Sequence, residues 1–503
     1  MEMLANLGHG FAVALEPLNL LWCFIGVFFG TIVGILPGLG PSATVALLLP
    51  LTASMNPTGG VIMLAGIYYG AKYGGSTTSI LMNVPGESAS VVTCLDGFEM
   101  ARKGRAGPAL GIAAISSFIA GTIGVVLLML VAPPVAEFAL RFGPPEYFGL
   151  MALGLSMVVL LAGKSMIKAL LAMLVGLWMS TIGIDMFTDG ARYTFDQIEL
   201  VDGIHFVVVA IGTFAIGEVL ANLTSKSGGQ MFKVPKGLRN LMPNWQDIKD
   251  SRFAFLQGSF IGFFVGVLPG AGSTIASFVS YGIEKAVSKH PEKFGTGVVE
   301  GVAAPEGANN SETGGALVPL LTLGIPGSAT TAILLAAFIL WGLRPGPLLI
   351  QDNPEMFWGL VASMYVGNIM LLILNLPLVP VFAQILRLPA YVLYPIILGV
   401  SMIGVYSVDQ RLFDAWLVGT FGLLGYLMRK MDYPAAPLLL GLVLGDLMEN
   451  ALRQSLMMSR GDVSILYSRP LAATMLVLTV LILIGPLFRR VNAWRLQAAE
   501  QEA

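Results

Sequence analysis

Long apolar segments recur along almost the whole chain, and shorter polar segments separate them. A helix that crosses a bilayer needs about 20 predominantly apolar residues, so the pattern predicts an all-α, polytopic membrane protein with roughly 10 to 12 spans. The apolar segments lie near residues 18–36, 107–131, 146–162, 166–184, 204–222, 253–268, 328–343, 356–386, 391–407, 411–428, 433–448 and 470–488.

The longest polar stretch, residues 224–252, divides these segments into two series and carries six basic residues against two aspartates. Basic loops favour the cytoplasmic side of a membrane, and the basic C-terminus is predicted to lie there too. We therefore expect a first transmembrane repeat at 1–223, a basic cytoplasmic linker at 224–252, a second transmembrane repeat at 253–469, and an extra C-terminal helix with a cytoplasmic tail at 470–503.

Four sequence anchors occur in the same order in both series, which indicates an internal duplication. One such match would carry little weight, but four in order predict two homologous halves. The anchors are GILPGLG at 34–40 and GVLPGAG at 266–272, GG at 74–75 and 314–315, VPG at 84–86 and IPG at 325–327, and LGLSM at 153–157 and LGVSM at 398–402.

The relative orientation of the two halves depends on the number of spans in each. If residues 217–220 correspond to residues 445–448, the segment 470–488 has no counterpart in the first half. If the linker and the C-terminus lie on the same side, an even number of spans follows the linker. Without the extra helix, each repeat then has an odd number of spans, which predicts inverted topology. Parallel repeats are the alternative, because this step rests on a four-residue match.

Proline and glycine interrupt the apolar segments at the repeated motifs, and hydroxyl residues follow each break. Irregular backbone at membrane depth is tolerated only where it is buried in protein or lines a wet cavity, so we expect broken or re-entrant helices. Their N-termini offer free N–H groups to a carboxylate. For an isolated Pro-Gly a packing kink is the alternative; repetition favours a site. The candidate substrate-binding residues at the breaks are Gly38, Gly40, Ser42, Gly86, Ser88, Gly270, Gly272, Ser273, Thr274, Gly327 and Ser328.

Polar clusters lie between the paired breaks. In the first half, Lys72, Ser76 and Thr77 are further candidate substrate-binding residues, and Lys72 either pairs with the substrate anion or forms a structural ion pair. The second-half cluster is rich in oxygen atoms that could coordinate Na⁺, although Glu312 could alternatively carry a proton. It consists of Asn309, Asn310, Ser311, Glu312 and Thr313.

Three further acidic residues, Glu218, Asp446 and Glu449, occur near predicted helix ends, where structural roles are favoured over functional ones. Two cysteines and three scattered histidines give no disulfide framework and no metal-ligand spacing. Besides the coupling ion, no cofactor is expected. The N-terminus has no cleavable signal sequence, so its apolar stretch is interpreted as a retained span.

Composition agrees with a membrane protein, because hydrophobic residues make up 55% of the chain, charged residues only 12%, and the mean hydropathy is +0.79. The formal net charge of −2 and the lack of a basic face argue against a nucleic-acid partner. The lipid bilayer is the expected surrounding of most of the chain.

At the two Gly-x-Leu-Pro-Gly-x-Gly elements, and at residues 69–76 and 309–315, the sequence resembles the large membrane subunit of tripartite tricarboxylate transporters, the TctA-like family. The resemblance covers nearly the whole chain. It implies a multi-pass permease of the bacterial inner membrane that works with a small membrane subunit and a periplasmic solute-binding protein. Such a transporter imports citrate-like organic acid anions by symport, coupled to a Na⁺ or H⁺ gradient.

Three rival functions are weaker. An ATP-driven permease would need a nucleotide-binding domain from another chain, because residues 163–165 copy only the end of a P-loop and Val158 stands where its first glycine should be. An intramembrane enzyme would need a nucleophile with its base, or a metal motif, and neither is found. A membrane channel is an alternative that gradient-coupled counterflow would exclude.

Overall fold

The structure is a computed structural model, and it describes residues 2–36, 40–161, 165–185, 187–224, 237–382, 384 and 390–484. Helices dominate these residues, and one two-stranded antiparallel sheet accompanies them, which confirms the predicted all-α class. Five of the described helices are long and apolar enough to cross a bilayer, and six shorter apolar helices accompany them. Gly38, residues 225–236 of the predicted linker and the tail from 485 onwards lie outside the described residues.

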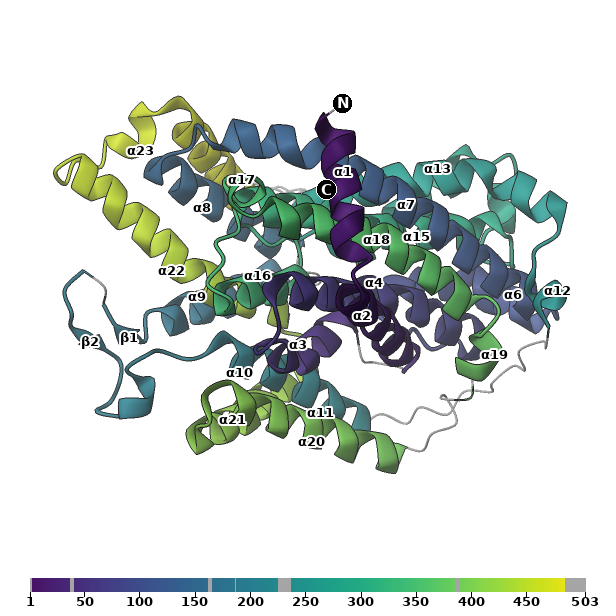
Figure 1. Cartoon of the computed structure of the whole chain (residues 1–503), viewed down its shortest axis with the longest axis horizontal. Helices are drawn as coiled ribbons and strands as arrows, with labels where there is room; N and C mark the ends of the chain where they lie inside the picture. Colours follow the sequence, from purple (N-terminus) through teal and green to yellow (C-terminus); the bar gives the residue numbers. More distant parts are fainter. Residues whose placement is uncertain are drawn as a thin grey trace, which may run out of the picture. The chain divides into compact units, whose positions relative to one another are not determined.

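The chain divides into two compact units, and each unit draws segments from both predicted halves (Figure 1). Unit 1 comprises Met1–Leu140 and His205–Met431, and unit 2 comprises Arg141–Ile204 and Asp432–Ala503. The paired breaks and their polar clusters all belong to unit 1.

The first part of unit 1 contains short helices around the breaks and three long ones. Its elements are α1 (Glu2–Ala14), α2 (Pro17–Ile35), α3 (Pro41–Thr52), α4 (Pro57–Met82), η1 (Ser88–Ser90), α5 (Val91–Thr93), η2 (Cys94–Phe98), α6 (Glu99–Arg102) and α7 (Ala106–Ala139).

The second part of unit 1 contains another series of long and short helices, in which α13, α14 and α15 correspond to α2, α3 and α4. Its elements are α10 (Phe206–Ala210), η4 (Ile211–Ile216), α11 (Gly217–Thr224), α12 (Leu238–Leu241), α13 (Trp245–Val267), α14 (Gly272–Val287), η5 (Pro291–Lys293), α15 (Glu300–Leu323), α16 (Ala329–Leu340), α17 (Leu349–Asp352), α18 (Pro354–Asn375), α19 (Val379–Phe382), α20 (Ala390–Asp409) and α21 (Leu412–Lys430).

Unit 2 contains the sheet and three long helices. Its elements are α8 (Pro144–Leu161), α9 (Met166–Ser180), β1 (Gly183–Ile184), β2 (Ala191–Arg192), η3 (Ile198–Leu200), α22 (Ala435–Met458), α23 (Ile465–Ser468) and an apolar helix at Pro470–Ile484.

A glycine stripe brings α2 into backbone contact with α4. Gly26, Gly30 and Gly34 are spaced by four residues, so they share one helix face. A Cβ atom added at Gly34 would lie 2.2 Å from the backbone oxygen of Ala71 on α4, so no larger side chain fits there. Small residues permit this close approach where helices cannot gain from a hydrophobic effect in lipid.

The same stripe recurs between α13 and α15. Gly258, Gly262 and Gly266 occupy the repeated positions, and a Cβ atom at Gly266 would lie 2.6 Å from the backbone oxygen of Glu312. The α2–α4 and α13–α15 pairs are therefore built on one plan. This repeated packing supports the duplication that the sequence anchors indicate.

The packing also fixes the alignment of the two halves more finely than the sequence does. Gly74 contacts α2 at Thr31 in the way that Gly315 contacts α13 at Phe263. Gly74 therefore corresponds to Gly315, one residue later than the sequence anchor at 314–315 suggests. With this alignment, one offset relates α4 to α15 and continues through the second break, from Gly86 to Gly327.

Outer helices exchange partners between the halves. In unit 2, α22 from the second half packs on α8 and α9 from the first. In unit 1, η4 from the first half packs on α20 and α21 from the second, and α11 from the first half packs on α21. The predicted repeats at 1–223 and 253–469 are consecutive in the sequence. Each compact unit, in contrast, combines helices from both repeats.

Two long helices, α4 and α15, were expected only as polar clusters between breaks. Both are almost completely buried, although glycines and polar side chains lower their hydropathy. The helix α13 also starts at Trp245 rather than near residue 253, because Asn244 and Asp247 form a capping box ahead of the apolar part. The described part of the expected long segment at 356–386 contains two helices, α18 and α19, and its residues 383, 385 and 386 lie outside the described residues.

Candidate functional site

Two contacts join helix tips from opposite halves of the chain. Near the start of α3, the hydroxyl oxygen of Ser42 lies 2.9 Å from that of Thr330 near the start of α16. At the start of α14, the Thr274 hydroxyl donates to Ser88 Oγ of η1 at 2.8 Å. The four breaks thus pair crosswise, because the first break of each half contacts the second break of the other.

The two tip pairs are equivalent under the internal repeat but differ in charge. We call the group formed by Ser42, Tyr68, Ser328, Thr330 and Thr331 the neutral tip pair. The group formed by Glu87, Ser88, Thr274 and Asn309 is the acidic tip pair.

The second breaks share one local backbone arrangement. The N–H of Glu87 donates to Ser90 Oγ at 3.2 Å, and the N–H of Ser328 donates to Thr331 Oγ1 at 2.8 Å. In each case a residue after the Pro-Gly turn starts a helix with help from a hydroxyl three positions later. Glu87 and Ser328 therefore occupy corresponding positions, and this one difference places a carboxylate in only one of the two tip pairs.

The first breaks leave their helix starts without side-chain caps. Neither Gly40, before α3, nor Ala271, before α14, makes a side-chain cap. The N–H of Gly270 donates to the carbonyl of Gly327 at 2.8 Å, and Gly270 and Gly272 both have positive φ angles that favour glycine. These uncapped starts retain backbone donors for an anion.

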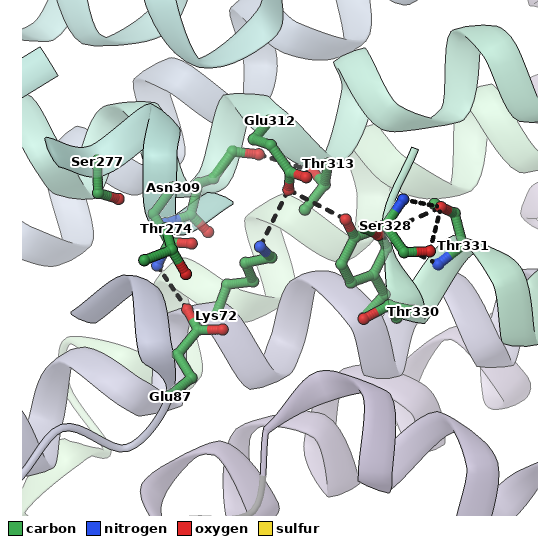
Figure 2. Close-up of polar contacts among 12 residues, drawn as sticks. Lys72, Glu87, Thr274, Ser277, Asn309, Glu312, Thr313, Ser328, Thr330 and Thr331 are labelled. Atoms are coloured by element: carbon green, nitrogen blue, oxygen red, sulfur yellow. Dashed lines mark hydrogen bonds and ion pairs between the residues drawn. The ribbon is translucent and has the colours of Figure 1, made fainter. Parts of the chain in front are cut away.

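A buried ion pair lies between the two tip pairs. Lys72 Nζ on α4 lies 3.0 Å from Glu312 Oε2 on α15, and Tyr68 donates its hydroxyl to the same oxygen at 3.0 Å. Of the described lysine and arginine side chains, Lys72 alone is buried, at 1% exposure. Figure 2 shows Lys72 between the labelled members of the acidic tip pair and those of the neutral tip pair.

Two further buried carboxylates lie in this region, and neither was singled out from the sequence. Glu87 accepts a hydrogen bond from Asn309 Nδ2 at 2.7 Å. Glu306 on α15 accepts one from Ser76 Oγ at 2.5 Å and another from the hydroxyl of Thr93. Glu87 carried a usable signal, because it directly follows the repeated Pro-Gly break. Glu306 carried none, since only the fold brings it to Ser76.

The first-half cluster divides between two surroundings. Ser76 bonds to Glu306, whereas Thr77 and Ser76 both line a cavity of about 10 Å³ that Asn375 and Ser117 also border. That volume suits a single water molecule rather than an organic acid. Of the three first-half candidates, Lys72 is the one that lies between the tip pairs.

The five candidate Na⁺ ligands on α15 point in several directions, because successive helical residues are rotated around the axis. Asn310 Nδ2 bonds to Ser117 Oγ on α7, and Ser311 Oγ donates to the carbonyl of Ser259 on α13. Thr313 Oγ1 donates to the carbonyl of Asn310. Asn309 instead bonds to Glu87, and Glu312 accepts from Lys72, so the five do not form one cluster.

Unpartnered oxygen atoms mark this part of α15. Asn309 Oδ1, Asn310 Oδ1 and Glu312 Oε1 are all buried and accept no hydrogen bond. A buried polar atom without a partner loses free energy, so such an atom in a native structure calls for a ligand or a water. Two of the three lie on the face that carries the Glu87 and Lys72 contacts.

The remaining candidates are backbone positions at the breaks. A Cβ atom at Gly86 would lie 2.5 Å from the carbonyl oxygen of Gly34, so the second break packs directly on the end of α2. Gly327 packs on Gly266 in the same way, with more room. Ser273 follows Gly272 in the first turn of α14 and is half-buried.

Ion pairs elsewhere support structural roles for two of the other acidic residues, Glu218 and Glu449, whereas the structural role of Asp446 stays a prediction. Glu218 on α11 pairs with Arg429 on α21, both in unit 1. In unit 2, Glu449 lies 2.6 Å from Arg453 and 2.8 Å from Arg192. The Glu218–Arg429 pair joins α11 to α21, the Arg192–Glu449 pair joins β2 to α22, and the Glu449–Arg453 pair lies within α22.

Comparison with known proteins identifies the family. Residues 20–440 match the Tripartite tricarboxylate transporter TctA family. The chain belongs to this family. It is therefore a component of a tripartite tricarboxylate transport system and a multi-pass membrane protein, and its family is one of transporters rather than enzymes.

Two relatives come from Agrobacterium vitis. The "Uncharacterized 52.8 kDa protein in TAR-I ttuC' 3'region" is 48% identical over 479 residues, which cover 95% of this chain and 94% of the relative. The "Uncharacterized protein in TAR-II ttuC' 3'region" is 44% identical over 234 residues, which cover 46% of this chain and 97% of the relative. No solved structure matches the chain significantly.

Proposed function

We propose that this TctA-family chain is the permease subunit of a secondary transporter of the bacterial inner membrane. It imports tricarboxylates or related organic acid anions by symport with Na⁺ or H⁺. A periplasmic solute-binding protein delivers the anion, and a small membrane subunit completes the complex. The observation that carries the proposal is the crosswise pairing of broken-helix tips around the buried Lys72.

The geometry supports an anion site between the tips. The uncapped start of α3 keeps backbone N–H groups, and hydroxyls of Ser42 and Thr330 lie beside it. Such donors hold a carboxylate without a cluster of basic side chains, which this membrane interior could accommodate only at high cost. Lys72 supplies the positive charge. When the anion binds, a substrate carboxylate replaces Glu312 as the ion-pair partner of Lys72.

The arrangement also favours a transporter over the rival functions. Broken helices paired across an internal repeat are typical of alternating-access transporters, in which one repeat moves against the other around a fixed site. A channel would need no such pairing of charged groups.

The test is uptake of radiolabelled citrate into proteoliposomes that contain this chain and the small membrane subunit. Uptake is expected only with the solute-binding protein present and with an inward gradient of Na⁺ or H⁺. Uptake without the binding protein would contradict the tripartite assignment, and uptake that ignores both gradients would favour a channel. Uptake driven by internal ATP alone would contradict secondary transport.

A further inference from the structure

The acidic tip pair contains an incomplete coordination shell. Asn309 donates from Nδ2 to Glu87, while its own Oδ1, in a side chain only 1% exposed, has no partner. Glu87 is 6% exposed, and Lys72, whose charge also acts on Glu87, makes its ion-pair contact with Glu312. A carboxylate and an orphaned amide oxygen therefore share one buried place.

Hydroxyl groups complete the oxygen set at the more open side of this place. The contact between Thr274 and Ser88 lies at the start of α14, and both residues are less buried than Glu87 and Asn309. Figure 2 draws Thr274, Asn309 and Glu87, which come from three separate elements, and the contact with Ser88 brings Thr274 to the residue that follows Glu87. An entering ion would meet the hydroxyls first and the carboxylate last.

The corresponding place in the neutral tip pair cannot bind a cation in the same way. Ser328 stands at the position of Glu87, and Tyr68 stands at the position of Asn309. Tyr68 offers a hydroxyl hydrogen that is already donated to Glu312, and Ser328 carries no charge. The repeat therefore supplies two copies of one scaffold, and only the acidic copy has a carboxylate of its own at this position, with the unpartnered amide oxygen of Asn309 beside it; Glu312, next to Tyr68, is already paired with Lys72.

Charge balance points to a cation as the missing ligand. Among the described residues, the buried set between and beside the two tip pairs contains one basic group, Lys72, against the carboxylates of Glu87, Glu306 and Glu312. Its formal charge is thus negative before any anionic substrate enters, and an anion would add to the repulsion in a medium of low dielectric constant. A bound cation next to Glu87 relieves that repulsion.

We propose that Glu87, Asn309 and Thr274 bind the coupling cation, and that this ion is Na⁺. The inference rests on the proposed symport function and assigns the cation to the acidic tip pair, which leaves the neutral tip pair to the anion. One carboxylate with neutral oxygens matches a monovalent hard cation. Among the described residues, no three His, Cys, Asp or Glu side chains gather as a divalent or transition metal requires.

The experiment measures sodium binding without transport. The full chain, purified in detergent with no organic acid present, is unfolded thermally in NaCl or in choline chloride at equal ionic strength. The melting temperature of the wild type is expected to rise with NaCl, because an ion that binds only the native state stabilises it. Glu87→Gln keeps the shape of the side chain and its hydrogen-bond acceptor, and it is expected to need at least about tenfold more Na⁺ for the same rise.

Matched variants at corresponding positions keep the result interpretable. Thr274→Val removes one ligand with little change of shape and is expected to weaken the sodium response, whereas Ser42→Ala and Ser328→Ala in the neutral tip pair are expected to retain it. If Glu87→Gln does not fold, the comparison of Thr274→Val with Ser42→Ala decides.

Three results would overturn the assignment. The first is a wild type whose melting temperature ignores Na⁺, including one that responds to pH instead. The second is a sodium response that survives Glu87→Gln and Thr274→Val. The third is a loss of the sodium response in Ser42→Ala and Ser328→Ala that equals the loss in Glu87→Gln and Thr274→Val. Failure of citrate uptake with an intact, Glu87-dependent sodium response would instead count against the proposed substrate and leave the cation site standing.

Discussion

The acidic and neutral tip pairs are two versions of one structure. In both, an uncapped helix start meets the second break of the other half through a single hydroxyl contact. They differ where Glu87 replaces Ser328 and Asn309 replaces Tyr68. Duplication thus provided two equivalent sites, and two substitutions gave them opposite preferences for charge.

The largest effect on stability and uptake is expected from changes to the buried ion pair of Lys72 and Glu312, which lies between the two tip pairs. Lys72→Met or Glu312→Leu alone leaves one uncompensated buried charge, which costs about 3–5 kcal/mol of stability. The double variant replaces both charges by apolar groups and is expected to regain most of that stability while citrate uptake stays lost. Thermal unfolding and proteoliposome uptake of the three variants measure this.

Uptake that returns in the double variant would reduce Lys72 and Glu312 to a structural ion pair. The anion would then be bound by helix starts and hydroxyls alone, without a basic side chain.

The next effect compares the glycine stripes that lead into the two first breaks. A Cβ atom at Gly34, before the neutral tip pair, meets backbone at 2.2 Å, against 2.6 Å at Gly266, before the acidic one. Alanine at either site forces the helices apart at a cost of about 1–3 kcal/mol, and we expect Gly34→Ala to lie at the upper end.

Thermal unfolding checks the order of the two variants. Gly282→Ala in α14 is the control, because nothing lies within 4 Å of its added Cβ. Equal melting temperatures for Gly34→Ala, Gly266→Ala and the control would show that the close helix packing does not hold the breaks in place.

A smaller effect separates the hydroxyl contacts. A hydrogen bond is worth about 0.5–1.5 kcal/mol, so removing one shifts a binding constant by about two- to tenfold. Ser42→Ala is expected to raise the KM for citrate measured at saturating Na⁺. Thr274→Ala is expected to raise the Na⁺ concentration for half-maximal uptake measured at saturating citrate. The reverse pattern would exchange the roles of the tip pairs.

The smallest effect concerns unit 2, which contains neither tip pair. The backbone N–H of Phe187 donates to Asp185 and, together with Arg453, lowers the pKa of that carboxyl below its usual value. A depressed pKa contributes stability that is present above the unfolded value and is lost as the pH falls through the folded one.

Acidification below about pH 4 should therefore speed hydrogen exchange in the segment 183–203, and Asp185→Asn should remove this pH dependence. Uptake parameters for citrate and Na⁺ are expected to be unchanged in Asp185→Asn at neutral pH. A changed sodium requirement in Asp185→Asn would show that sodium binding depends on unit 2 and not on the acidic tip pair alone.

The sequence predicted the helical class, the duplication and the breaks, because Pro-Gly motifs and apolar runs are local signals. It did not predict α4 and α15 as long buried helices, since Gly74, Asn309 and similar residues lower the hydropathy that identifies a span. Polar residues tolerated at such depth are those that find partners in other helices, and a single sequence does not show those partners.

The candidate site was predicted by residue type but not by arrangement. Lys72 and Glu312 were both named, yet their contact joins residues of opposite halves and depends on how α4 packs against α15. The candidate Na⁺ ligands were read as one run, whereas helical rotation separates Asn309 from Asn310 and Ser311. Glu87 directly follows a repeated Pro-Gly break and could have been named from that, but its contact with Asn309 depends on the fold.

The most direct test of the contrast is a single set of uptake curves in proteoliposomes for Glu87→Gln and Ser328→Ala. Citrate is varied at saturating Na⁺, and Na⁺ is varied at saturating citrate, so that each binding step is measured with the other site filled. We predict that Glu87→Gln raises the Na⁺ concentration needed for half-maximal uptake and leaves the citrate KM near that of the wild type. Ser328→Ala is predicted to raise the citrate KM and to leave the Na⁺ requirement near that of the wild type. Parallel changes of both parameters in both variants would contradict the division of the two tip pairs between cation and anion.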